Sequence, residues 1–123
     1  MNNYGVKIGD IFSASWGYDQ TNYNFFQVVK LCGKQSVRVR EVSLPVVNSQ
    51  SVGFLAETNT YRIPEGEMLP AIPYRSVFIK DQENGDLKRI RKYGENICFN
   101  LSSFTDAYLE KDLEIECYES WTH

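Results

Sequence analysis

The chain has 123 residues, of which 42% are hydrophobic, 14% aromatic and 24% charged, and its formal net charge is −3. This composition excludes a disordered chain, and no window approaches the roughly 20 consecutive apolar residues of a membrane-spanning helix. A chain of this size buries about two-thirds of its unfolded surface on folding, so we expect one domain over residues 1–123 with its own core.

The N-terminal residues, MNNYGVKIGD, lack the basic start and apolar stretch of a signal peptide, so we expect a cytoplasmic protein. The three cysteines, Cys32, Cys98 and Cys117, are odd in number and widely spaced, without a C-x-x-C pair. This spacing favours reduced, mostly buried thiols over a disulfide framework or a zinc site. We therefore expect no metal and no cofactor.

The first third of the chain shows the period-two pattern of strands. In residues 11–16, IFSASW, apolar residues recur at every second position; residues 24–33, NFFQVVKLCG, are rich in β-branched and aromatic residues; residues 36–42, SVRVREV, alternate valine with arginine. We expect three strands, the second and third joined as a hairpin through residues 32–35. The residues expected on core faces are Phe12, Ala14, Phe26, Val28, Val37 and Val39, together with most of the Trp16 ring.

The middle of the chain is interrupted by proline. Residues 43–73 contain all four prolines, each of which removes a backbone donor. We expect one strand near residues 52–63 and a winding connection after it. Residues 74–93 contain Asn84-Gly85, a dipeptide that adopts the positive φ angles of tight turns, so we expect two short strands around it.

The last third again alternates. Residues 96–104, NICFNLSSF, and residues 112–118, DLEIECY, predict two strands. Between them, Ser103 and Asp106 have the spacing of a helix N-cap, which predicts one helical turn. Seven or so short strands without a long 3.6-residue period predict an all-β fold: a small, single-domain antiparallel barrel or sandwich, with an SH3-like or OB-like barrel among the forms that fit.

The sequence carries no catalytic motif. Its only histidine is the terminal His123, and the phosphate-binding, dinucleotide-binding and nucleophile-elbow patterns are missing. Carboxylates such as Asp10, Asp19, Glu57 and Glu65 have no spacing that pairs them as an acid and a base. We expect no catalytic residues, and a binding protein rather than an enzyme.

The connection between the first two expected strands is polar and about six to eight residues long, whereas a minimal hairpin needs two to five. The side chains of Asp19 and Asn22 can bond nearby backbone amides, so turn chemistry is one interpretation. Trp16, Tyr18 and Gln20 combine an indole, a phenol and an amide, which is typical of binding surfaces. The candidate contact residues are Trp16, Tyr18, Asp19, Gln20 and Asn22.

The stretch GDIFSASWGYDQTNYNFFQVVKL, residues 9–31, resembles the opening of a group of small, uncharacterised proteins from bacteriophages and other mobile elements of Gram-positive and gut bacteria. In that group SWGYDQTN is followed two residues later by an aromatic residue and then by QVV. The C-terminal stretch AYLEKDLEIECYESW is similar to a second element, AYLWDGK followed by YxSW, with Glu110, Lys111 and Asp112 in place of Trp-Asp-Gly. The resemblance implies a phage or mobile-element accessory protein and implies no particular activity.

Two classes of function fit these observations. The leading one is a non-enzymatic binding module that contacts a host protein or a small ligand. The alternative is a small β-barrel that binds single-stranded nucleic acid, in which basic residues contact phosphates while Tyr18 or Tyr93 stacks on bases. The basic candidates are Arg38, Arg40, Lys88, Arg89, Arg91 and Lys92. Outward Lys and Arg also protect edge strands from aggregation, and the negative net charge disfavours nucleic acid.

Overall fold

The computed structural model describes residues 4–16, 22–53, 56–63, 67–102, 105–112 and 114–120. These residues form ten strands and no helix. The described part of the chain therefore contains no helix that could cross a membrane. The prediction of an all-β fold is confirmed, with ten strands in place of about seven.

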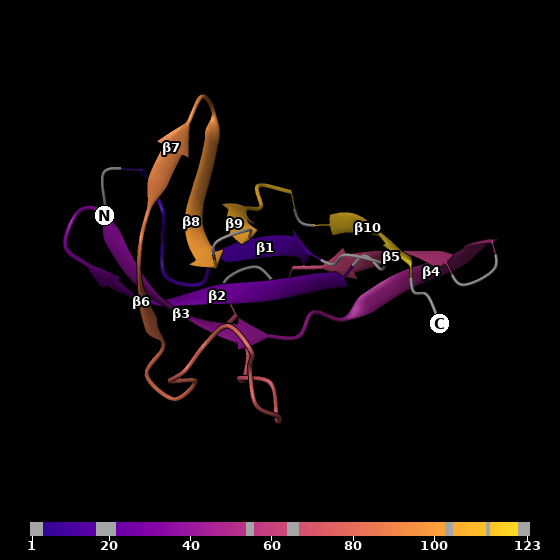
Figure 1. The fold of residues 1–123 in the computed structure, drawn as a ribbon, viewed down its shortest axis with the longest axis horizontal. Coiled ribbons are helices and arrows are strands. Elements are labelled where there is room, and N and C mark those ends of the chain that lie inside the picture. Colours follow the sequence, from indigo (N-terminus) through magenta and orange to yellow (C-terminus); the bar gives the residue numbers. More distant parts are fainter. Residues whose placement is uncertain are drawn as a thin grey trace.

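Seven strands make up the larger sheet: β1 (Ile11–Trp16), β2 (Asn22–Cys32), β3 (Ser36–Val42), β6 (Asp86–Arg89), β7 (Arg91–Tyr93), β8 (Asn96–Ser102) and β9 (Thr105–Leu109). They are antiparallel neighbours in the order β6, β3, β2, β1, β9, β8, β7. The two edge strands, β6 and β7, are separated in the chain only by Ile90, and β6 also contacts β8. The sheet therefore curls into a nearly closed barrel, from which the β7–β8 hairpin projects (Figure 1).

Three strands make up the smaller sheet: β4 (Val46–Gly53), β5 (Ala56–Arg62) and β10 (Glu114–Ser120), in the order β10, β5, β4. Where one strand was expected near residues 52–63, the chain forms β4, turns back and forms β5. Figure 1 shows this sheet beside one end of the barrel.

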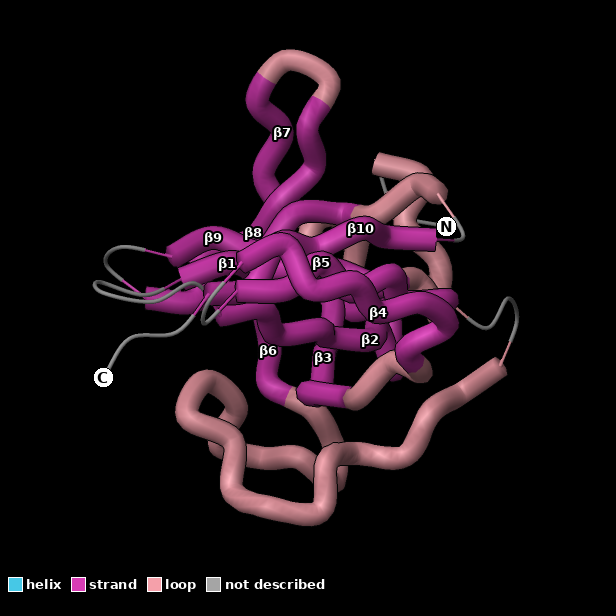
Figure 2. Tube along the Cα trace, turned by 90° about the vertical axis from the view of Figure 1, so that its right-hand side faces the viewer, coloured by secondary structure: helices cyan, strands magenta, loops and turns pink. Residues whose placement is uncertain are grey.

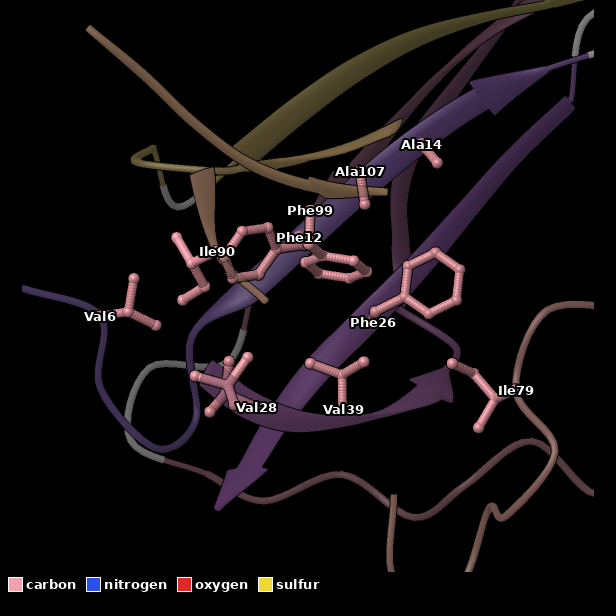
Figure 3. Packing of buried hydrophobic residues seen from close by; sticks show 11 residues of the cluster. Val6, Phe12, Ala14, Phe26, Val28, Val39, Ile79, Ile90, Phe99 and Ala107 are labelled. Carbon is pink, nitrogen blue, oxygen red and sulfur yellow. The ribbon is translucent and has the colours of Figure 1, made fainter. Parts of the chain in front are cut away.

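The barrel interior is packed around three phenylalanines. The ring of Phe99 lies 4.8 Å from that of Phe12 and 6.0 Å from that of Phe26, measured between centroids, and all three side chains are fully buried (Figure 3). Tilted and edge-on aromatic pairs of this kind add to the stabilisation from burial alone. The core positions predicted from alternation are confirmed, because each is at most 2% exposed: Phe12, Ala14, Phe26, Val28, Val37 and Val39.

A second apolar cluster lies between the two sheets. Strands β1 and β2 are buried on both faces, because Ile11 and Phe25 point away from the barrel interior and pack against the smaller sheet. The ring centroids of Phe25 and Tyr61 are 4.8 Å apart. Ile115 and Cys117 of β10 belong to the same cluster. The consecutive aromatic residues at the start of β2 thus serve two separate cores.

Of the two short strands expected around Asn84-Gly85, the second is confirmed as β6, but the first is wrong. Gly85 has a φ of +83°, and its N–H donates to the carbonyl of Asp81 at 2.8 Å, so the dipeptide does turn the chain. The residues before the turn form no strand, because the Asp86 carboxylate accepts the backbone N–H groups of Lys80 and Asp81 at 2.8 and 2.9 Å. Side chains replace a strand ladder in this segment, which follows a long loop path outside the barrel (Figure 2).

The predicted helical turn at Ser103 and Asp106 is also wrong. Ser103 lies outside the described residues, and Asp106 is in β9, where its Oδ1 accepts a hydrogen bond from Asn100 Nδ2 at 3.0 Å. The next residue, Ala107, is fully buried in the barrel core. Pairing with strands on both sides satisfies the backbone better than one isolated helical turn, whose nucleation is unfavourable.

Candidate functional site

A pocket opens at the end of the barrel where β3 separates from β2. The last Cα pair between these strands is Phe25 with Val42, whereas β2 continues back to Asn22 alongside β1. The volume of the pocket is about 160 Å³. We call it the tyrosine pocket; it is lined by Tyr23, Tyr61 and Tyr74, by Asn24, Glu41 and Ser43, and by Phe25, Val42 and Leu44.

Glu41 provides the charge of the pocket. Glu41 is 4% exposed. Its two carboxylate oxygens accept hydrogen bonds from Ser76 Oγ at 2.6 Å and from Asn24 Nδ2 at 2.9 Å. Both donors are neutral, and the single ion pair recorded among the described residues joins Arg62 to Glu114. A buried carboxylate without a cationic partner is costly, so Glu41 favours the approach of a positive group.

The backbone around Glu41 is held in place as firmly as its side chain. Its N–H donates to Gln82 Oε1 at 2.7 Å, and its carbonyl accepts from Gln82 Nε2 at 3.1 Å and from the N–H of Ile72 at 3.1 Å. These bonds attach the loop that carries Tyr74 to strand β3. The wall of the pocket is therefore organised by contacts distant in sequence.

The three tyrosines differ in how they are held. Tyr61 packs on Phe25 with an interplanar angle of 57°, and Tyr23 packs against the cluster between the sheets. Tyr74 is 65% exposed and stands at the rim. The described lining contains no histidine, cysteine or lysine.

Sequence reasoning missed Glu41, although a signal was present. In SVRVREV, Glu41 continues the alternation of Val37 and Val39, which places a carboxylate at a core-facing position. Buried charges are rare, and they gather at functional sites. Tyr74 gave no such signal, because it lies in a loop whose path depends on distant contacts.

The polar connection predicted from sequence falls largely outside the described residues. Tyr18, Asp19 and Gln20 lie outside the described residues. Trp16 and Asn22 form the last Cα pair of β1 and β2, directly before Tyr23, but their side chains also lie outside what the structure describes. Their role in contact, and the expected burial of the Trp16 ring, remain predictions.

The basic residues of β3 and β6 are divided between two faces. Arg38 lies opposite Leu87, whereas Lys88 lies opposite the fully buried Val37, so Lys88 is on the barrel-core face and Arg38 on the other. Arg38 Nη1 donates to the carbonyl of Gly85 at 2.8 Å.

The remaining basic candidates lie in different surroundings. Arg40 Nη2 donates to the carbonyl of Leu69, and its Nε is buried. Arg89 Nη2 donates to Gln35 Oε1 at 3.2 Å. Arg91 and Lys92 are exposed on the β7–β8 hairpin, which projects from the barrel (Figure 1). The six candidates do not form one continuous surface.

A second hollow, of about 320 Å³, has mixed charge. It is lined by Lys30, Arg38, Asp81 and Asn84. Hydrogen bonds from the backbone and then the side chain of Asn84 lower the pKa of the Asp81 carboxyl below its ordinary 3.8. The two cations therefore face an ionised acid, which makes the hollow a poor anion site.

The cysteines and potential metal ligands are dispersed. Cys98 and Cys117 are buried and Cys32 is partly buried, as the sequence predicts. Burial raises the pKa of the Cys98 thiol, with a smaller upward contribution from the Asp106 carboxylate. In the described part of the chain, no three His, Cys, Asp or Glu side chains gather where they could hold a metal ion.

Comparison with known proteins identifies no relative: no protein-family model, no curated protein and no solved structure matches the chain. The resemblance of residues 9–31 to phage and mobile-element proteins thus remains an expectation from sequence. The function must be inferred from the geometry of the site.

Proposed function

We propose that this protein is a non-enzymatic binding module that holds a host protein or a small ligand at the tyrosine pocket, with Tyr18, Asp19 and Gln20 as further candidate contacts. The observation that carries the proposal is an open pocket lined by the buried acidic residue Glu41 and by three tyrosines. Tyrosine is enriched in recognition surfaces because it offers a large, rigid contact area and a hydroxyl group. As the resemblance implies, the setting is an accessory role for a phage or mobile element in the host cytoplasm.

The position of the pocket supports this role. Asn24 and Glu41 stand on neighbouring strands, and their side chains are joined at 2.9 Å. Polar groups held on rigid strands bind with little loss of conformational entropy. The exposed Tyr74 can contact a partner without being required for the core.

The test is affinity capture from host lysate with the immobilised full chain, Tyr74→Ala and Tyr18→Ala. We expect each substitution to leave the melting temperature nearly unchanged and to reduce capture of the same partner at least fivefold. Tyr108→Ala is the matched control, because Tyr108 is 45% exposed but lies on β9, outside the pocket. Equal capture by all folded variants would contradict the proposal.

The second candidate function, binding of single-stranded nucleic acid, rests on one specific feature. Strand β7 consists of Arg91, Lys92 and Tyr93, all exposed, and Tyr93 is 57% exposed. A projecting hairpin with two cations and an aromatic ring suits phosphate contact and base stacking. A labelled oligothymidylate tests it, because binding should fall steeply with salt and with replacement of Lys88, Arg89, Arg91 and Lys92 by Ser.

A further inference from the structure

We propose that the tyrosine pocket recognises a primary alkylammonium group, carried either by a lysine side chain of a partner or by a free amine. This inference rests on the proposed function, since it assigns a ligand chemistry to the same pocket. Its starting point is the mismatch between the buried charge of Glu41 and the neutral groups around it.

The first argument is the remaining hydrogen-bonding capacity of Glu41. A carboxylate has about four lone-pair sites on its two oxygens, and the structure gives each oxygen one bond, from Ser76 Oγ and Asn24 Nδ2. An ammonium group brings three donors and a positive charge. It would add charge-assisted bonds to an acceptor that no described cation neutralises.

The second argument is the composition of the walls. Tyr74 lines the pocket together with Glu41 and is exposed, and the quadrupole of an aromatic ring face attracts cations. The described lining contains no Lys, Arg or His that could hold an anion. A phosphate or carboxylate ligand would meet Glu41 without a compensating charge, so the pocket selects for a cation.

The third argument is size. The pocket volume is about 160 Å³, and an engineered apolar cavity of about 150 Å³ accommodates benzene. The end of an unbranched alkylammonium chain fits this space, whereas a nucleotide does not. Tyr74 lines the pocket and is 65% exposed, so the chain behind the ammonium group can continue past it into solvent or into a partner.

The experiment is an NMR titration of the full chain with n-butylammonium chloride and, at equal ionic strength, with the uncharged n-butanol. The reporters are the Asn24 side-chain amide and the backbone amides of Ser43 and Leu44. We expect saturable shifts with n-butylammonium and at least tenfold weaker binding of n-butanol. A second pair, Nα-acetyl-lysine methylamide and its Nε-acetylated form, distinguishes the two sources. Tighter binding of the charged lysine derivative than of n-butylammonium assigns a partner's lysine, and the reverse order assigns a free amine.

Variants of the chain distinguish the contribution of the Glu41 charge to n-butylammonium binding from that of the Tyr74 ring. Glu41→Gln removes the charge and should weaken n-butylammonium binding at least tenfold. Because Glu41 also anchors Ser76, Tyr74→Ala serves as a second variant that spares the core, with an expected loss of at least threefold. Tyr108→Ala should bind like the unmodified chain.

Two outcomes would overturn the inference. If n-butanol shifted the same amides with equal affinity, the pocket would bind ligands without recognising their charge, and the proposed function would stand without this ligand class. If the folded chain bound neither charged probe, the ammonium assignment would fail, while partner capture that depends on Tyr74 would still test the proposed function separately.

Discussion

Ser76 donates its hydroxyl proton to Glu41 Oε1 over 2.6 Å, a buried hydrogen bond between residues 35 positions apart in the chain. The same Ser76 oxygen accepts the backbone N–H groups of Phe78 and Ile79 at 3.2 and 3.0 Å. One hydroxyl therefore organises a loop turn and fastens it to strand β3. The wall of the tyrosine pocket depends on this connection.

Replacing Ser76 by Ala should lower the free energy of unfolding by about 1–3 kcal/mol, because it removes a donor to Glu41 and the hydroxyl oxygen that accepts the backbone N–H groups of Phe78 and Ile79. Urea denaturation measures the change. Ser49→Ala on β4 is the control, since Ser49 is exposed and its replacement should change stability by less than about 0.5 kcal/mol. Equal effects of the two substitutions would show that the Ser76 bonds contribute little.

Replacing Phe99 by Ala should cost roughly 3–5 kcal/mol, because it opens a cavity between the rings of Phe12 and Phe26 at the centre of the barrel. Val77→Ala, at a residue 77% exposed, should stay within about 0.5 kcal/mol of the unmodified chain. Urea midpoints of both variants check the ranking. A small loss for Phe99→Ala would mean that this aromatic cluster does not form the core.

Gly85→Ala should destabilise the fold more than Gly33→Ala. Both residues have positive φ, +83° and +70°, so both substitutions meet backbone strain of about 1–2 kcal/mol. Only at Gly85 would the added Cβ also lie 2.9 Å from Val29 Cγ2 and 3.0 Å from the Val39 carbonyl oxygen. Thermal melts of the two variants isolate this steric contribution, and equal melting temperatures would argue against the close approach.

Asn84→Ala should raise the pKa of Asp81 toward its ordinary 3.8, because Asn84 provides the side-chain hydrogen bond that helps to lower it. The folded pKa lies below the unfolded value, so the stabilisation is complete above the unfolded pKa and is lost as the pH falls through the folded value. The window therefore lies below about pH 4. Carboxyl ¹³C titrations of the two proteins measure the shift, and identical Asp81 curves would contradict the assignment.

Cys32 should react with iodoacetamide before Cys98 and Cys117 in the folded protein. Cys32 is partly exposed, while the other two are buried, and burial raises the pKa of Cys98, which lowers its thiolate fraction. Mass spectrometry of timed reactions at pH 8 gives the order. Addition of urea should bring the three rates together, and early labelling of Cys98 without urea would contradict its burial.

Local pattern was sufficient for the strands that alternate clearly. The hairpin of β2 and β3 and the core positions from Phe12 to Val39 follow from period-two alternation, because a one-residue slip would expose every apolar side chain. The same reasoning missed that β1 and β2 are covered on both faces, since Ile11 and Phe25 become core residues only when the smaller sheet packs on them.

Sequence patterns gave wrong predictions in two segments, where contacts distant in sequence bond the backbone. The segment before Gly85 is apolar enough for a strand, but its amides bond Ser76 and Asp86, which no local window can foresee. Conversely, Asp106 suggested a helix cap, yet the flanking strands were available to pair with its segment. In both cases contacts distant in sequence outweighed local propensity.

The all-β class, the β2–β3 hairpin and the alternating core follow from the sequence alone, because these depend on which side chains must leave water. That Glu41 and Tyr74 line one pocket, although they are far apart in the chain, is visible only in the tertiary structure. The pocket forms because β3 separates from β2 after Val42 and because the hydrogen bond from Ser76 to Glu41 attaches the loop of Tyr74 to β3. Loop closure over such a separation costs entropy, which the buried hydrogen bonds and the two cores together offset.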